Sequence, residues 1–381
     1  MSNIIILGIT SLLTDVSSEM VYPLIAVYLT TLGATPAIIG IIEGIAESTA
    51  SLLKVFSGHF SDKIKKRKPF TIFGYGFSAI GKIFLYIATS WVGVLFARVF
   101  DRFGKGVRTA PRDALIAESS SAQKKGKAFG IHRSMDTIGA SSGVLLSWYF
   151  MTVMKDAYRT VFLISIIPAV LGVAALFLVK ENASAVPQDN KGKKVTVNFK
   201  NFKLLNKKLQ YFLIIALLFT LGNSSNQFLF LRSKGLGFSA SDIILLYLVY
   251  NLVYAFSSYP AGVISDKIGR KKLLVLGYLF YGIVYLGFAV AKAPVTIWVL
   301  FSLYGLYMGL TDGIEKAFIS DVAPQEQKAT MIGLHATIVG IGLFPASLIA
   351  GILWTKIGPV APFLMGGVTG IVSAVLLLVL I

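Results

Sequence analysis

The sequence contains no cysteine among its 381 residues. This absence excludes a disulfide scaffold and any thiolate metal site. Charged residues are also scarce: Asp, Glu, Lys and Arg make up 14% of the chain, against about a quarter in a soluble globular domain. Together with 55% hydrophobic residues and a positive mean hydropathy, this composition excludes an ordinary soluble domain and predicts a polytopic membrane protein.

Further absences narrow the function. The sequence contains no G-x-x-x-x-G-K-[ST] motif, which is the P-loop that binds ATP. This argues against transport driven by ATP hydrolysis. Three scattered histidines argue against a resident metal, and we expect no metal site and no cofactor. Paired carboxylates in the first spans are nevertheless compatible with a divalent cation as the substrate. The first apolar run has the length of a membrane span and carries acids, which argues against a cleavable signal peptide.

Long apolar runs fill most of the chain. Windows of about 20 residues predict twelve spans, near residues 4–31, 36–59, 69–90, 91–118, 126–152, 157–179, 209–231, 241–264, 272–291, 294–319, 329–353 and 358–381. The prediction is an all-α polytopic membrane protein with three parts: an N-terminal six-helix bundle at 1–180, a polar cytoplasmic linker at 181–208 and a C-terminal six-helix bundle at 209–381.

The net charge of +18 is unevenly distributed along the chain. Basic clusters fall in alternate loops, at Lys63–Lys68, Lys124–Lys127, Lys191–Lys208 and Lys267–Lys272, whereas the opposite loops are nearly uncharged. By the positive-inside rule the basic loops are cytoplasmic, which predicts a plasma (inner) membrane protein with both termini in the cytoplasm. The basic excess therefore indicates membrane topology and not a nucleic-acid partner.

Two basic stretches repeat each other. Gly58–Lys68 reads GHFSDKIKKRK and Gly262–Lys272 reads GVISDKIGRKK, each between two apolar runs. Glycine allows two helices to approach closely, and an aspartate can face a helix N-terminus. Further matches at an offset near 203, such as His132 with His335, indicate two related halves joined in tandem. We interpret each repeat as a tight, gate-like turn between membrane helices.

The repeated stretch resembles the G-x-x-x-D-x-x-G-R-[RK] loop of the major facilitator superfamily. The C-terminal copy matches fully, whereas the N-terminal copy has Lys65 at the glycine position and Lys66 at the arginine position. The resemblance implies twelve transmembrane helices in two pseudo-symmetric six-helix bundles, with a substrate site near the bilayer midplane between them. It implies gating roles for Gly58, Asp62, Lys66, Arg67, Gly262, Asp266 and Arg270, and for the helix-ending acids Glu118 and Asp321, which alternatively serve only as caps.

The N-terminal half carries many ionisable residues inside its spans. Each costs about 2.5–3.5 kcal/mol on insertion, so such groups are functional candidates by default. Asp15 and Glu19 lie four residues apart, on one helical face with Tyr22, and Glu43 and Glu47 have the same spacing. These acids predict a polar, proton-accepting interior.

The fourth span carries a charged stripe at helical spacing, made of Arg98, Asp101, Arg102, Lys105, Arg108 and Arg112. Arg98 with Gly104 and Gly106 resembles the R-x-x-x-G-x-G-x-G pattern of proton-coupled members of the family, which implies a coupling role for that arginine. Asp101 and Arg102 depart from the pattern and suggest an ion-pair network. On the fifth span His132, Arg133 and Asp136 share a face, and His132 has packing as its alternative role.

Depth arithmetic predicts specific pairs. At about 1.5 Å per helical residue, Asp15 and Arg102 each lie roughly 16 Å from opposite membrane faces in a core of ~30 Å. We therefore expect Asp15 to meet Arg102 and Glu19 to meet Arg98, with at least one acid exchanging a proton. The predicted coupling group is Asp15, Glu19, Arg98, Asp101 and Arg102, and a static network that only holds helices together is the alternative.

The corresponding C-terminal positions are mostly uncharged. The second half instead offers amide and aromatic side chains, of the kind that line adaptable sites for amphipathic molecules, although the aromatic residues can equally pack or face lipid. Across both halves the candidate substrate residues are Tyr22, Glu43, Glu47, Arg108, His132, Asn223, Asn226, Gln227, Asn251 and Tyr304.

These features predict a proton-coupled secondary transporter that works by alternating access and exports small amphipathic or anionic organic compounds by proton antiport. A lysolipid, organic-anion or phosphorylated-metabolite transporter, a divalent-cation exporter and a membrane sensor remain as alternatives. An enzyme is disfavoured because the mid-span acids are matched by bases, which suits coupling. The expected partners are a small-molecule substrate, protons and membrane lipid, and we expect a monomer.

Overall fold

The computed structural model describes residues 2–64, 66–120, 125–154, 158–180, 205–324 and 328–381, and all regular elements in these ranges are helices. Lys65, at the glycine position of the first gate copy, lies outside the described residues. So does most of the predicted linker, residues 181–204.

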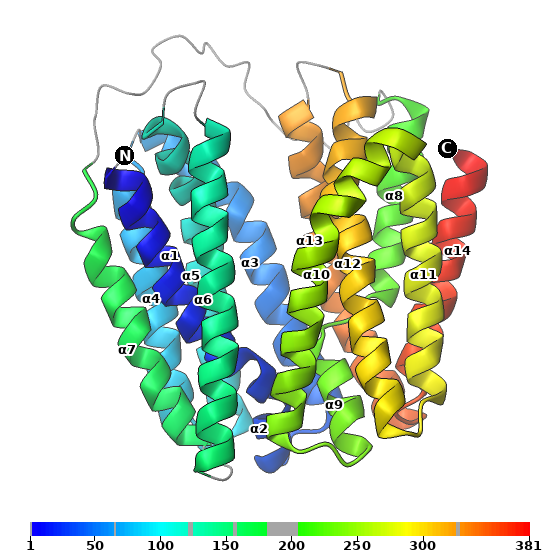
Figure 1. Ribbon diagram of the computed structural model, residues 1–381, viewed down its shortest axis with the longest axis horizontal. Helices are drawn as coiled ribbons and strands as arrows, with labels where there is room; N and C mark the ends of the chain where they lie inside the picture. Colours follow the sequence, from blue (N-terminus) through cyan, green and yellow to red (C-terminus); the bar gives the residue numbers. More distant parts are fainter. Residues whose placement is uncertain (1, 65, 121–124, 155–157, 181–204, 325–327) are drawn as a thin grey trace. The chain divides into compact units, whose positions relative to one another are not determined.

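The N-terminal series runs α1 (Ser2–Val21), the 3₁₀ helix η1 (Tyr22–Leu24), α2 (Ile25–Thr31), α3 (Pro36–Ile64), α4 (Lys68–Ile87), α5 (Trp91–Glu118), α6 (Lys125–Val153) and α7 (Tyr158–Leu176). The C-terminal series runs α8 (Lys207–Gly222), α9 (Gln227–Gly235), α10 (Ala240–Ile268), α11 (Arg270–Val290), α12 (Pro294–Val322), α13 (Lys328–Lys356) and α14 (Ala361–Leu380) (Figure 1). Because α1 with α2 and α8 with α9 each form one interrupted span, the described residues form twelve spans. The predicted all-α, twelve-span fold is confirmed.

Two spans are broken where the sequence predicts continuous ones. The first breaks at η1, where Pro23 lacks the N–H that an α-helix needs. The seventh ends at Gly222 and resumes at Gln227, across the segment Asn223–Asn226. Asparagine and serine side chains compete with the helical backbone for hydrogen bonds, which explains a break that apolar windows do not detect.

Nine helical segments of the described chain are apolar enough, and long enough, to cross a membrane by composition alone. The spans that fall short are α3, α5 and α6. All three belong to the N-terminal series and carry the ionisable residues singled out above.

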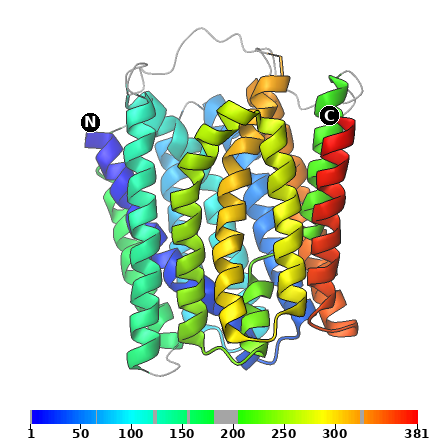
Figure 2. The same ribbon diagram turned by 45° about the vertical axis from the view of Figure 1, so that its right-hand side comes forward.

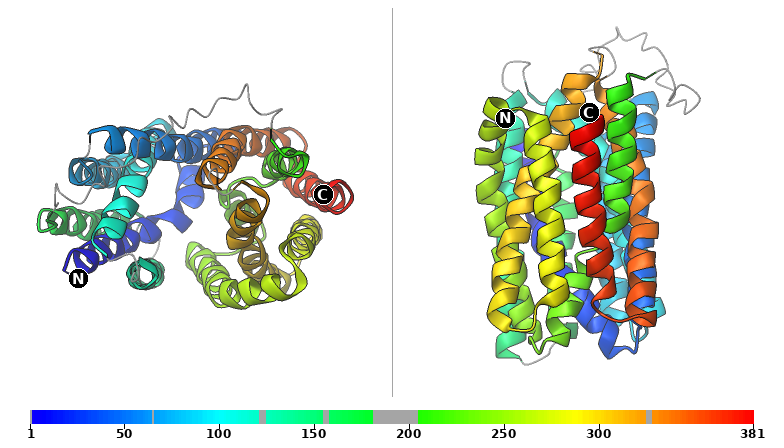
Figure 3. Two further views of the ribbon diagram at one scale, coloured as in Figure 1. Left: turned by 90° about the horizontal axis from the view of Figure 1, so that it is seen from above. Right: turned by 90° about the vertical axis from the view of Figure 1, so that its right-hand side faces the viewer.

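The chain forms two compact units. Unit 1 comprises Met1–Ala34, Ile45–Lys191 and Ala240–Leu245, and unit 2 comprises Thr35–Gly44, Gly192–Ser239 and Leu246–Ile381. In unit 1, α1 packs on α6 and α7, and α4 packs on α5. In unit 2, α12 lies between α10 and α11 (Figure 2), and α14 lies beside α11 and α8 (Figure 3).

Glycines bring the charged helix α5 into backbone contact with its neighbours. A Cβ atom added to Gly104 would lie 2.3 Å from the carbonyl oxygen of Gly74 on α4. One added to Gly106 would lie 2.8 Å from the carbonyl oxygen of Ala50 on α3. The two glycines of the predicted coupling pattern thus let α5 press against α4 and α3, and this contact positions its charged stripe.

In both units a lysine side chain caps the C-terminal end of the last helix. The Lys68 ammonium donates to the carbonyl oxygens of Phe177 and Val179, at 2.9 and 2.7 Å. The Lys271 ammonium donates to the Leu378 carbonyl oxygen at 3.0 Å. A cation at a helix C-terminus satisfies free carbonyls and the helix dipole. The sequence repeat is therefore also a repeat of detailed contacts.

Candidate functional site

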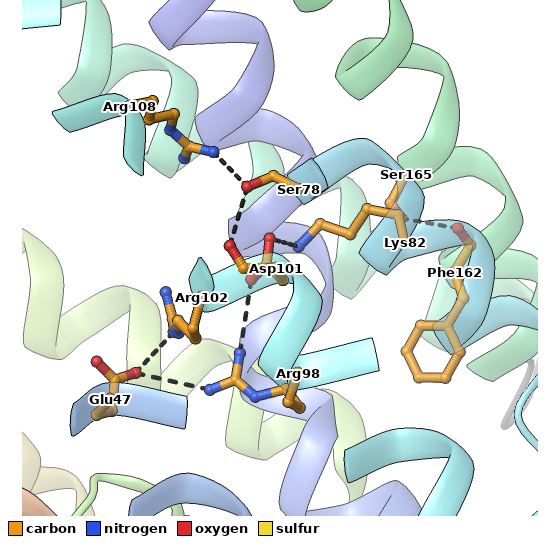
Figure 4. Close-up of polar contacts among 9 residues, drawn as sticks. All are labelled: Glu47, Ser78, Lys82, Arg98, Asp101, Arg102, Arg108, Phe162 and Ser165. Carbon is orange, nitrogen blue, oxygen red and sulfur yellow. Dashed lines mark hydrogen bonds and ion pairs between the residues drawn. The ribbon is translucent and has the colours of Figure 1, made fainter. Parts of the chain in front are cut away.

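A buried ionic network joins α3, α4 and α5 inside unit 1 (Figure 4). Arg102 Nη2 lies 2.9 Å from Glu47 Oε1, and Arg98 Nη2 lies 3.6 Å from the same oxygen. One carboxylate on α3 thus faces two guanidinium groups that are one turn apart on α5. The i, i+4 spacing of the two arginines produces this arrangement.

The network continues from α5 to α4 through Asp101. Lys82 Nζ lies 3.1 Å from Asp101 Oδ1, and Arg98 Nη1 lies 3.8 Å from Asp101 Oδ2. The side chains of Lys82 and Asp101 are only 4% and 7% exposed. Removing charges from water is costly unless opposite charges are close, so the alternation of acids and bases is what makes this burial tolerable.

Arg108 extends the stripe by a further two turns. Its guanidinium donates to the Ser78 hydroxyl, which in turn donates to the Asp101 carbonyl oxygen at 3.0 Å. The Arg108 Cζ atom also lies 4.3 Å from the ring centroid of Tyr75. Arg108 is thus held by α4, and its predicted contact with an anionic substrate stays a prediction.

A cavity of about 20 Å³ lies beside the network. Its lining residues are Asp15, Ser18, Glu19, Tyr22, Arg98, Asp101, Arg102, Lys105 and Arg108. A cavity needs about 10–15 Å³ to hold one water molecule, so this one has room for a water and not for an organic compound. Eight of the nine lining residues are ionisable, counting Tyr22, which suits proton exchange.

The predicted pair of Asp15 with Arg102 is wrong. Arg102 lies on Glu47, and no described side chain makes a hydrogen bond or ion pair with Asp15. Depth arithmetic gives the height of a residue in the membrane but not the helix that it faces, and α3 supplies the partner instead of α1. Glu19 and Arg98 line the same cavity, and their pairing stays a prediction.

Span five brings two of its predicted residues together. His132 Nδ1 lies 3.4 Å from Asp136 Oδ2, one turn along α6. On α5, Arg112 donates to Asp113 at 2.8 Å and to the Ser11 hydroxyl of α1 at 3.3 Å. Arg133 is exposed. A role for His132 in substrate binding therefore stays a prediction.

The predicted gate acids meet the basic stretch in both units. Arg67 Nε lies 2.7 Å from Glu118 Oε1, and Arg270 Nη1 lies 2.7 Å from Asp321 Oδ1. Arg270 also lies 3.5 Å from Asp266. These contacts fit the gating hypothesis, which the structure does not test.

Two details of the predicted gate need correction. Gly58–Ile64 and Gly262–Ile268 are helical and form the ends of α3 and α10. In the C-terminal copy the chain changes direction at Gly269, whose φ is +94°. Arg67 takes the place of Arg270, while Lys66 is exposed, because the N-terminal copy has one additional residue after its aspartate. The side chain of Asp62 lies outside what the structure describes.

The other predicted substrate residues belong to unit 2, and most of their contacts are with residues that were not predicted. Tyr304 donates to Asn226 Oδ1 at 2.9 Å, and Asn223 donates to the Tyr307 hydroxyl at 3.2 Å. Ser225 donates to Glu43, a buried carboxylate at the start of α3, at 3.2 Å. Asn251 donates to the carbonyl oxygen of Tyr247 in its own helix, and Gln227 is fully buried.

Sequence reasoning missed several charged residues inside spans. Lys82 lies in an otherwise apolar helix and completes the network of unit 1. In unit 2, Tyr254 donates to Asp312 at 2.9 Å and Tyr278 donates to Glu315 at 2.8 Å. Lys82, Asp312 and Glu315 are each an ionisable side chain within a predicted span, and that signal could have identified them. Among the described residues, no group of three or more His, Asp and Glu side chains is arranged to hold a metal ion.

The comparisons with known proteins agree on one family. The model of the Major Facilitator Superfamily matches residues 7–233 and 212–381. An uncharacterised MFS-type transporter of Methanocaldococcus jannaschii is 41% identical over 383 residues, which cover 99% of this chain and 94% of that protein.

Two further similarities are more distant. The crystal structure of the nucleoside transporter NupG superposes with a TM-score of 0.83 at 16% identity, over 100% of this chain and 99% of that one. The quinolone resistance protein NorA of Staphylococcus aureus is 26% identical over 148 residues, which are 39% of this chain and 38% of NorA. The first similarity concerns the fold alone, and the second covers only part of each chain.

Proposed function

The chain belongs to the Major Facilitator Superfamily, whose members are transporters and not enzymes, and on that premise we propose that it is a proton-coupled secondary transporter. It works by alternating access and exports small amphipathic or anionic organic compounds in exchange for protons. It resides in the plasma membrane as a monomer, with both termini in the cytoplasm, as the distribution of its basic loops suggests.

The observation that carries this proposal is the ionic network of unit 1 beside a cavity of about 20 Å³. Asp15 lines that cavity, and no described side chain pairs with it, whereas Glu47 and Asp101 are held by cations. A carboxyl group that has room for a water and no fixed partner can gain and lose a proton without breaking the network. We assign the exchanged proton to Asp15.

The lining of the cavity supports an anionic substrate. It holds four basic side chains and three acidic ones. This excess of one basic side chain attracts an anion more strongly than a neutral or cationic compound. The partial similarity to NorA, a quinolone resistance protein, agrees with export of organic compounds.

Transport driven by an imposed pH gradient tests this function. The purified full chain is reconstituted into liposomes with an acidic interior, and two fluorescent probes are added outside: anilinonaphthalene sulfonate, an amphipathic anion, and N-phenylnaphthylamine, which lacks the sulfonate. We expect the anion to accumulate inside protein-containing vesicles only while the gradient lasts. Equal accumulation with and without the gradient, or none of either probe above protein-free vesicles, would contradict the proposal.

A further inference from the structure

Unit 2 contains a cluster of a carboxyl, an imidazole and a phenol that the function above does not use. The Tyr278 hydroxyl on α11 donates to Glu315 Oε1 on α12 at 2.8 Å. His335 Nε2 on α13 lies 3.5 Å from the other carboxyl oxygen, Oε2. Three helices thus bring one acid and two other titratable groups to a single point.

The cluster is shielded from solvent. The side chains of Glu315 and His335 are 18% and 8% exposed, and Tyr278 is fully buried. The Phe212 ring of α8 stacks on His335 with centroids 5.8 Å apart, and the Phe219 ring stacks on Tyr278 at 4.0 Å. Glu315 is therefore a carboxyl group in largely aromatic surroundings, where charge is costly.

The neighbouring charges partly cancel. On α12, Asp312 and Lys316 pair with each other at 2.9 Å and are 41% and 56% exposed. From α10, Tyr254 donates to Asp312 and not to Glu315. Tyr307 lies two turns before Glu315 on α12 itself. Among these groups Lys316 is the one cation, and it is already engaged by Asp312.

Glu315 and His335 lie within ion-pair distance of each other but form no hydrogen bond. His335 Nε2 is a buried nitrogen that makes no hydrogen bond with a described residue, although a carboxyl oxygen lies 3.5 Å away. A proton added to either group would turn this contact into a donor–acceptor pair, since a protonated carboxyl donates to imidazole and an imidazolium donates to a carboxylate.

We propose that Glu315, together with His335 and Tyr278, forms a proton-binding site in unit 2. Glu315 and His335 share the bound proton, and Tyr278 holds the carboxyl group in place by donating to its other oxygen. This extends the proposed proton coupling to the second unit, and it rests on that function only for its use in transport. Proton binding itself is a separate property of the cluster.

The equivalent place in unit 1 has an arginine where unit 2 has Glu315. The repeat relates Tyr278, Glu315 and His335 to residues 203 positions earlier, which are Tyr75, Arg112 and His132. His132 Nε2 is likewise buried without a hydrogen bond to a described residue. Arginine stands at the position of the carboxyl, and a guanidinium group does not release its proton in proteins. Unit 1 therefore supplies a matched control within the same chain.

Infrared difference spectroscopy tests the proposal without any transport substrate. Spectra of the purified full chain in lipid nanodiscs are recorded during a pH titration, and the carbonyl stretch of protonated carboxylic acids is followed. We expect Glu315→Gln to remove one such band and Tyr278→Phe to shift its frequency, because the carboxyl loses a hydrogen bond. Glu315→Asp keeps a protonatable carboxyl, and it should keep a displaced band if the Gln variant fails to fold.

The histidine variants decide whether the site is shared. His335→Asn should change the pH at which the Glu315 band appears, whereas His132→Asn should leave that pH unchanged. Identical carboxyl spectra for wild type and Glu315→Gln would contradict proton binding at Glu315. An unchanged titration in His335→Asn would contradict the claim that His335 shares the proton. A chain that shows the band but fails the pH-gradient experiment would refute the proposed transport and leave the proton site intact.

Discussion

The helix pair α4 and α5 of unit 1 corresponds to α11 and α12 of unit 2, but different side chains join the two helices in each pair. In unit 1, Lys82 of α4 and Asp101 of α5 form a buried ion pair at 3.1 Å. At the positions 203 residues later, Tyr285 of α11 and Tyr304 of α12 place their rings 6.0 Å apart. At this position one unit is joined by an ion pair and the other by two tyrosine rings.

The same contrast extends along the two helices. Arg98, which contacts Glu47 and Asp101, corresponds to Phe301, whose ring lies 5.5 Å from Phe288. A helix position that carries a permanent charge in one unit carries an apolar ring in the other. The repeat therefore conserves the geometry of the fold, whereas the chemistry at these interior positions has diverged between the two units.

The largest expected effect on stability comes from replacing Asp101, the acid of the ion pair in unit 1. Replacement by alanine leaves Lys82 without its carboxylate, and removing one partner of a buried pair costs about 3–5 kcal/mol. Tyr304→Phe at the equivalent place in unit 2 removes one hydrogen bond to Asn226 and should cost about 1 kcal/mol. Denaturant unfolding of the purified chain in detergent measures both.

A double variant separates the ion pair from general loss of packing. Because Asp101→Ala alone strands an ammonium group, Lys82→Ala/Asp101→Ala should be more stable than Asp101→Ala. A double variant whose loss equals the sum of the two single losses would show that the pair is not coupled.

A smaller effect is expected at the gate, where the two units are alike. Arg67→Ala removes a charged hydrogen bond to Glu118, worth about 1.5–3 kcal/mol, and transport should slow by roughly tenfold. Lys66→Ala, one residue earlier, changes an exposed side chain and should slow it less than about twofold. Initial rates in proteoliposomes compare the two, and equal rates would contradict a gating role for the Arg67–Glu118 pair.

The smallest effect is expected at the lysine caps, where the two units are alike. Lys68→Ala and Lys271→Ala each remove a cation from the end of the last helix of a unit, and each should cost about 0.3–1 kcal/mol. Lys272→Ala, at an exposed neighbouring position, is the control and should be neutral. Unfolding free energies that differ widely between Lys68→Ala and Lys271→Ala would show that the two caps are not equivalent.

The sequence predicts the fold well and the site only in part. Apolar windows locate the spans, since burial in lipid requires long apolar helices. The break at Asn223–Asn226 is missed because its residues alter backbone hydrogen bonding within an otherwise span-length window. Helical spacing correctly places Arg98, Asp101 and Arg102 on one stripe.

What spacing does not give is the partner of each charge. Glu47 and not Asp15 meets Arg102, because rotation and tilt of neighbouring helices decide which side chains touch. Glu315 is missed for another reason. No repeat marks it where it stands beside Asp312 and Lys316, and only the folded chain brings Tyr278 and His335 to it.

The central claim is that Asp15 exchanges the proton that drives transport, and Asp15→Asn tests it most directly. The amide keeps the size of the side chain and breaks no ion pair to a described residue. In proteoliposomes the variant should still exchange anilinonaphthalene sulfonate between equal pH values within about twofold of wild type, yet fail to accumulate it against a gradient when the interior is acidic. Accumulation at the wild-type level in Asp15→Asn would contradict the claim.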